Sequence, residues 1–262
     1  IGGNNGAGAP TAAGIEAIAL GVTARTGSGA GNVMVGTNTG AAAITGSQNV
    51  AIGPNAGQGI GTSIRTVSIG YQSNASNSSA IAIGSQTTAS GNSGIAMGVN
   101  ASAAGTESVA IGSGASATLA SNGSVAVGYS TTASGDQAIA LGGAAEATAD
   151  FALAAGITAR AAGQAGVALG NNTNTGTGDE CISIGSNTGS FVGTGPRNIA
   201  IGASAFDANT SGSDNVSIGR DAMTASNTAS NNVSIGNNTC MNLSSGNNNT
   251  VVGYGAAGSL TT

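Results

Sequence analysis

The residues that could carry out chemistry in this chain are few. The 262 residues include ten Asp and Glu, five Arg, two Cys and three Tyr, but no His and no Lys. Acid–base catalysis by His, His–metal sites, Schiff-base formation and Lys phosphate clamps are therefore excluded. Two facing carboxylates could cleave a glycosidic bond, but the adjacent pair Asp179 and Glu180 has the character of solvated loop charge. We expect no enzymatic activity, no cofactor and no metal.

The charge and hydropathy of the chain argue against nucleic-acid binding and against membrane insertion. The net charge is −5 and the Arg residues form no basic cluster, so nucleic acid is not an expected partner. Gly, Ser or Asn interrupts every apolar run before it reaches the roughly 20 residues of a membrane helix, so we expect no membrane insertion in this segment.

The two cysteines, Cys181 and Cys240, fit no metal-binding or redox spacing. Two unpaired thiols are the favoured interpretation. Intrachain and interchain pairing both stay open at this point.

One motif recurs along nearly the whole chain: an apolar residue, a small residue, a second apolar residue and Gly, as in Ile81-Ala82-Ile83-Gly84. Apolar residues two apart follow the period of a β-strand and not that of a helix. A three-residue strand buries little alone, so about sixteen repeats must stack and align Ile and Val into continuous apolar columns, which we expect to be the core residues, with Ala and Ser between them. The sequence predicts an all-β, parallel β-solenoid of 14–17-residue coils.

The Gly that closes the motif is expected at a corner, where the backbone needs a positive φ or approaches the next coil closely. These structural glycines include Gly84, Gly98, Gly112, Gly142, Gly202, Gly219, Gly236 and Gly253.

The spacing of the glycines separates two coil types. The 17-residue steps run from Gly36 to Gly70 and from Gly185 to Gly253, and 14-residue steps prevail between them, with an irregular patch around Ala154, where Phe151-Ala152-Leu153-Ala154 is taken as the motif. We therefore expect four zones: an N-terminal extension or fragment edge (1–14), mainly 17-residue coils (15–70), mainly 14-residue coils (71–170), and 17-residue coils with a C-terminal cap (171–262).

Two further patterns refine the coils. In the 14-residue coils, small residues at the third and fifth positions after Gly, such as Thr87 and Ala89, predict a second short strand. In 17-residue coils, Asn precedes the motif at Asn198, Asn215, Asn232 and Asn249. Stacked at one level, these amides could form a hydrogen-bonded ladder, although Asn also suits a turn that enters a strand.

All three tyrosines, Tyr71, Tyr129 and Tyr254, directly follow the repeat Gly. They are candidate surface contacts, since exposed aromatic rings can stack on sugars. The alternative is that each ring fills a corner of the coil.

The coils from Ala80 to Gly142, with segments such as Ser108-Val109-Ala110-Ile111-Gly112, resemble the head repeats of trimeric autotransporter adhesins. The resemblance implies a left-handed parallel β-roll and a homotrimer. The 17-residue coils, such as the one that begins at Asn198, resemble repeats of bacteriophage tail fibres. The basic neck, heptad stalk and membrane barrel of a complete adhesin are not found, so we expect an adhesin fragment or a fibre of another origin, with a preference for a phage fibre.

These features predict a non-enzymatic, extracellular fibrous protein: a shaft or receptor-binding segment of a phage tail fibre or bacterial adhesin, acting by multivalent attachment. Its partners would be further copies of itself and a host-surface receptor or glycan. The alternative is a structural filament subunit that polymerises end to end through its terminal coils. Ice binding is disfavoured, because the site equivalent to Thr87 and Thr131 holds Ala in other coils.

Overall fold

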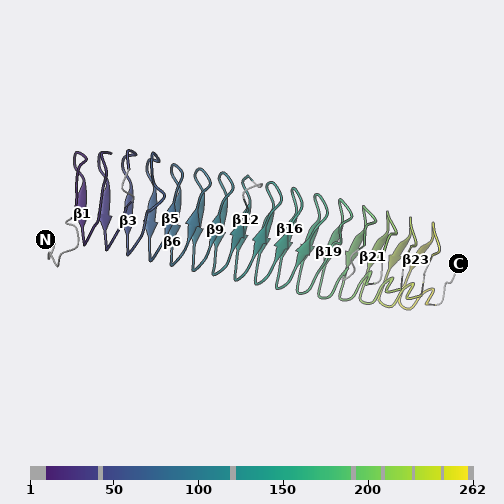
Figure 1. Ribbon diagram of the computed structural model, residues 1–262. Coiled ribbons are helices and arrows are strands. Elements are labelled where there is room, and N and C mark those ends of the chain that lie inside the picture. The colour runs from purple at the N-terminus through teal and green to yellow at the C-terminus, as the bar shows by residue number, and fades with distance from the viewer. Residues whose placement is uncertain are drawn as a thin grey trace. The chain divides into compact units, whose positions relative to one another are not determined.

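The computed structural model describes residues 10–40, 44–118, 122–189, 193–207, 210–225, 228–242 and 245–258. Residues 1–9 of the expected N-terminal extension therefore lie outside the described residues. The chain divides into two compact units, residues 1–130 and 131–262. Within the described residues, all regular elements are short β-strands joined by turns, as Figure 1 shows. The predicted all-β, parallel β-solenoid is confirmed.

In the first unit, the repeated motifs form a parallel sheet in which each strand pairs in register with the next. Its strands are β1 (Ile18–Leu20), β2 (Val33–Val35), β3 (Val50–Ile52), β4 (Val67–Ile69), β6 (Ile81–Ile83), β8 (Ile95–Met97), β10 (Val109–Ile111) and β12 (Val125–Val127). A second parallel sheet contains β5 (Asn74–Ala75), β7 (Thr88–Ala89), β9 (Ser102–Ala103) and β11 (Ser116–Ala117).

The second unit repeats this plan. Its first sheet contains β14 (Ile139–Leu141), β16 (Leu153–Ala155), β18 (Val167–Leu169), β19 (Ile182–Ile184), β20 (Ile199–Ile201), β21 (Val216–Ile218), β22 (Val233–Ile235) and β23 (Thr250–Val252). Its second sheet contains β13 (Thr132–Ala133), β15 (Glu146–Ala147) and β17 (Arg160–Ala161).

One predicted motif was placed two residues too early. The strand is Leu153–Ala155 and not Phe151-Ala152-Leu153, because Leu153 pairs with Ile139 on one side and with Val167 on the other. Gly156 then closes the coil, at a 14-residue step from both Gly142 and Gly170, so the expected irregular patch is a regular coil. The error arose because Ala155 stands where other coils have Ile, Val, Leu or Met.

The predicted orientation of the strands was wrong, because the small middle residue of the motif points inward. In β2 to β12 the middle residue has no exposed surface, whereas the Val, Ile or Met residues at its two sides are half-buried or exposed. The 14-residue coils of the first unit thus have a core of Ala, which includes Ala82, Ala96 and Ala110. The columns of Ile and Val do exist, but they lie on the outer face of the sheet.

The width of the coil explains this reversal. The two sheets lie so close that the backbone N–H of Ala75 in β5 donates a hydrogen bond of 2.9 Å to Ser68 Oγ in β4. A branched side chain has no room between them, since interiors are already packed to crystal density. The 17-residue coils are wider and bury larger side chains, such as Ile44 and Ile60 in the first unit and Phe206 and Met223 in the second.

The predicted second strand of the 14-residue coils is confirmed, and it also faces inward with its small residues. Thr87 and Ala89 are fully buried, and Thr88 between them points outward. In the second unit Thr131 is likewise buried. The threonines considered for ice binding therefore do not form an exposed row.

Candidate contact surfaces

The corner glycines allow successive coils to approach each other. Gly98 has a φ of 132°, and a Cβ added there would lie 2.5 Å from the carbonyl oxygen of Gly112. At Gly219, φ is 134° and an added Cβ would lie 2.5 Å from the carbonyl carbon of Gly236. Only glycine fits such a corner. The other named glycines share the positive φ: Gly84, Gly112, Gly142, Gly202, Gly236 and Gly253.

The second residue after a corner glycine has a left-handed backbone, and it carries a side chain toward solvent except where it is itself glycine, as at Gly114 and Gly255. Gln86 and Asn100, for example, have φ values of 57° and 56°. Their backbone N–H groups bond to the preceding coil, at Tyr71 O (2.8 Å) and Ser85 O (3.0 Å). Side chains at this position therefore form a row across successive coils, and the hydrogen bonds between coils hold their backbone in place.

The three tyrosines are all exposed at the corner. The exposed fractions are 48% for Tyr71, 71% for Tyr129 and 80% for Tyr254. These fractions argue against rings that fill a corner of the coil. A role in contact with a ligand stays a proposal.

The asparagines that precede the motif in the second unit lie in one column, in which Asn198, Asn215 and Asn232 are buried and Asn249 is half-buried. Asn215 Nδ2 donates to Asn198 Oδ1 at 3.0 Å and to Ala229 O at 2.8 Å. Asn232 and Asn249 repeat the amide–amide bond at 3.1 Å. Each Oδ1 also accepts the backbone N–H of the next Asn in the column. The column is internal, so it stabilises the stack and is not a contact surface.

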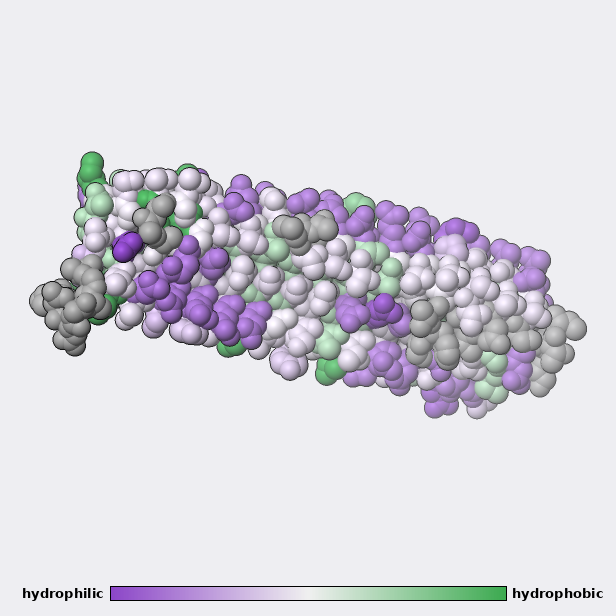
Figure 2. All heavy atoms as spheres, in the orientation of Figure 1, coloured by the Kyte–Doolittle hydropathy of each residue, from purple (hydrophilic) through white to green (hydrophobic). Residues whose placement is uncertain are grey.

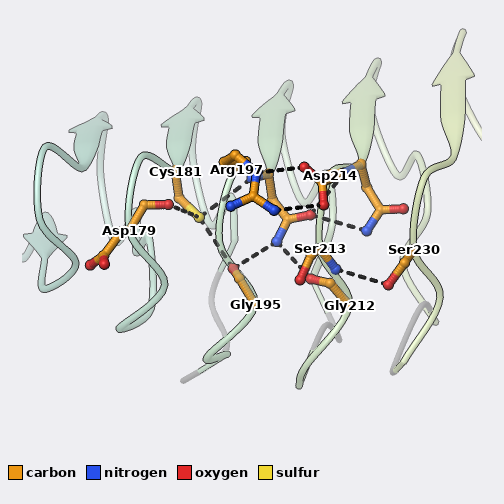
Figure 3. Close-up of polar contacts among 10 residues, drawn as sticks. Asp179, Cys181, Gly195, Arg197, Gly212, Ser213, Asp214 and Ser230 are labelled. Atoms are coloured by element: carbon orange, nitrogen blue, oxygen red, sulfur yellow. Dashed lines mark hydrogen bonds and ion pairs between the residues drawn. The ribbon is translucent and has the colours of Figure 1, made fainter.

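Cys181 occupies the first place in this column (Figure 3). Its Sγ accepts the backbone N–H of Asn198 at 3.5 Å and lies 3.4 Å from Gly195 O. Burial raises the pKa of the Cys181 thiol, and hydrogen bonds from Asn198 partly oppose that shift. Cys240 is also buried, and burial raises the pKa of its thiol. Both cysteines are unpaired, which rules out a disulfide between them.

The carboxylates of the second unit make structural contacts. Asp179 Oδ1 accepts the backbone N–H of Gln164 at 2.9 Å. Arg197 and Asp214 form a bidentate ion pair between adjacent coils, shown in Figure 3. No group of three or more His, Cys, Asp or Glu that could hold a metal ion is found among the described residues.

Sequence reasoning missed the most extensive candidate surface, the outer face of the first sheet. The two large apolar residues of each motif form this face, and Ile52, Met97 and Ile111 in the first unit are 38–40% exposed. In the second unit Ile139, Leu141 and Ile235 have similar exposures of 38–39%. The motif places large residues at two positions and a small residue between them, but this pattern does not show which side of the strand is buried. We call this surface the outer apolar face.

Figure 2 shows patches of hydrophilic residues on a mostly neutral background, with few strongly hydrophobic residues on the side in view. None of the described segments is a helix with the length and hydropathy needed to cross a membrane.

Comparison with known proteins supports the resemblance seen in the sequence. The family model for the YadA head domain repeat matches residues 62–87, 89–115 and 121–145. A solved structure titled as the collagen-binding domain of the Yersinia adhesin YadA is 23% identical, with a TM-score of 0.32. The similarity covers 60% of this chain and 66% of that one, just under two thirds of its length. No curated protein matches the chain. Residues 62–87, 89–115 and 121–145 are therefore similar in sequence to YadA head repeats.

Proposed function

We propose that this chain is part of a trimeric adhesin head at an extracellular surface, where it attaches to a host-surface receptor or glycan through many weak contacts. The matched YadA head repeats support the adhesin role. The comparisons support neither the phage tail fibre nor the self-polymerising filament.

The observation that carries the proposal is the outer apolar face. In the first unit the motifs of β3 to β12 stack in register, so Val50, Val67 and Ile81 form one column. Ile52, Ile69 and Ile83 form a second, parallel column. Exposed apolar side chains that lie side by side in this way commonly mark an interaction site.

Further copies of the same chain are the fitting occupants of this face. The face is made of uncharged apolar side chains, so the same face on other copies can cover it around one symmetry axis. Association of the outer apolar faces would bury the half-exposed Val and Ile of every coil. We propose three chains because the sequence resembles trimeric autotransporter adhesins.

Attachment by such an assembly depends on avidity. Three linked copies make the second and third contacts intramolecular, which can raise the overall affinity by about 10²–10⁴-fold without a new kind of contact. The tyrosines Tyr71, Tyr129 and Tyr254 are proposed contributors, because their rings are exposed at corners outside the strands of the outer apolar face.

The test combines oligomeric state with attachment. Ile83→Asp with Ile111→Asp places two carboxylates on the outer apolar face, and Ser102→Asp places one on the outer side of the second sheet as the control. Sedimentation equilibrium should give a trimer for the wild type and the control, and a monomer for the double variant. Attachment to cultured epithelial cells and to collagen-coated wells should fall with trimer loss. A stable wild-type monomer would contradict the proposal.

A further inference from the structure

A groove of about 420 Å³ lies on the surface of the first unit where wide coils meet narrow ones. It is lined by Asn38, Asn55, Gln58, Gln72, Asn74 and Thr88. These residues follow the corner glycines of successive coils by two to five positions, and none belongs to a strand of the outer apolar face. We call it the amide groove.

The change in coil length creates the groove. The coil that closes at Gly70 is a 17-residue coil and carries an additional turn whose Ile60 is buried. The next is a 14-residue coil and has β5 in the corresponding place. The backbone N–H of Gly59 in this turn donates to Asn74 Oδ1 in the narrower coil at 2.9 Å.

The lining is polar and uncharged throughout. Asn38 Nδ2 donates to Asn55 Oδ1 at 2.7 Å, and Gln58 Nε2 donates to the backbone oxygen of Asn38. A primary amide has two N–H donors and an oxygen with two lone pairs, so these bonds leave donors and acceptors for a ligand. A charged ligand would lose hydration here without gaining a counter-charge.

The groove is also pre-organised. Asn38, Asn55 and Gln72 occupy left-handed corners with φ of 54–56°. The backbone N–H of Asn55 bonds to Thr37 O at 2.9 Å, and that of Gln72 bonds to Pro54 O at 3.0 Å. Binding of a ligand to such a surface therefore costs little conformational entropy of the protein backbone. Tyr71, the chain neighbour of Gln72, has an exposed ring but does not line the groove.

We propose that the amide groove binds a neutral oligosaccharide. Hydroxyl groups both donate and accept hydrogen bonds, which matches the amides of the groove and the hydroxyl of Thr88. The proposal rests on the proposed attachment function and names the ligand class for one of its contact sites. Because the groove lies outside the strands of the outer apolar face, it stays open when chains associate through that face.

The test uses the full chain on a printed array of neutral oligosaccharides, together with the same oligosaccharides capped by sialic acid or sulfate. The groove variant is Gln58→Ala with Gln72→Ala. The control is Asn172→Ala, which removes an equivalent corner amide in the second unit, bonded to Asn187 Oδ1 at 2.9 Å. Circular dichroism and sedimentation verify that each variant keeps its fold and assembly.

We expect wild type and control to bind neutral oligosaccharides, and the groove variant to lose about tenfold or more in affinity, the equivalent of about 1.4 kcal/mol. Binding only to the charged set, or neutral binding that survives in the groove variant, overturns the inference. Wild type that attaches to cells yet binds no neutral oligosaccharide overturns the inference and leaves the proposed function standing. A wild type that attaches to nothing overturns the function itself.

Discussion

The guanidinium of Arg197 holds the carboxylate of Asp214 in the next coil through two parallel hydrogen bonds, Nε to Oδ1 at 2.6 Å and Nη2 to Oδ2 at 2.9 Å. Both residues lie two positions before a repeat motif and have a left-handed backbone, with φ of 58° and 60°. This position, which differs from the corner after the repeat glycine, can therefore link adjacent coils by charge. Because the pair is exposed, its contribution to stability is modest and sensitive to salt.

A pH dependence follows from this pair. The hydrogen bond and charge of Arg197 lower the pKa of Asp214 below its usual range. The stabilisation is complete above the unfolded-state pKa and is lost as the pH falls through the lowered folded pKa. NMR titration of the Asp214 carboxyl should give a low midpoint, which returns to the ordinary range in Arg197→Ala. An ordinary midpoint in the wild type would contradict the pairing.

The substitution Cys181→Asn should extend the buried asparagine column by one coil. Asn198 N–H now bonds to a thiol sulfur at 3.5 Å, whereas Asn215 N–H bonds to an amide oxygen at 3.0 Å. We expect a gain of about 0.5–1.5 kcal/mol, the usual net value of a hydrogen bond. Slower hydrogen exchange of the Asn198 backbone amide in the variant than in the wild type would show this gain. Cys181→Ala, which removes the acceptor, should have the opposite effect, and equal exchange in both variants would refute the idea.

Gly219→Ala should be strongly destabilising. The new Cβ would meet the Gly236 carbonyl carbon at 2.5 Å, at a φ of 134°. Backbone strain alone costs about 1–3 kcal/mol, and the clash adds to it. Gly143→Ala is the matched control, because nothing lies within 4 Å of the position that its new methyl group would take and its φ is not positive. Thermal unfolding should separate the two variants, and similar melting temperatures would contradict the account of the corner.

Ala110→Val tests the inward orientation of the small residue. Ala110 has no exposed surface and packs in the Ala core of the first unit, so two added methyl groups should cost about 1–3 kcal/mol by overpacking. Ser116→Val adds bulk on the outer side of β11, where Ser116 is only half-buried, and should change stability by no more than about 0.5 kcal/mol. If Ser116→Val were the more damaging of the two in a urea titration, the assignment of inside and outside would be wrong.

The sequence was sufficient to predict the strands, their stacking and the corner glycines, because a four-residue motif repeated at a nearly constant step leaves few other folds. It did not reveal which side of a strand faces inward. Alternation places Val109 and Ile111 on one side and Ala110 on the other, and only the distance between the sheets decides which side is buried. The register of Leu153 was missed for a similar reason, since Ala155 weakens the motif and pairing with β14 and β18 sets the register.

The candidate sites were harder to predict from the sequence than the fold was. Tyr71 could be singled out because aromatic residues are rare in the chain. The amide groove could not, because Asn38, Gln58 and Asn74 are ordinary polar residues that come together only when coils of unequal length are stacked.

The change of coil length leaves the strands undisturbed. Val67 pairs with Ile81 across a 14-residue step in the same register as Val50 pairs with Val67 across a 17-residue step. Insertions and deletions are therefore accommodated in the turns, and the pairing of the strands does not change. A three-residue deletion in one coil can therefore create or remove a surface groove while the strands of the neighbouring coils keep their register. Binding sites on this fold can thus change during evolution without a change in the strands.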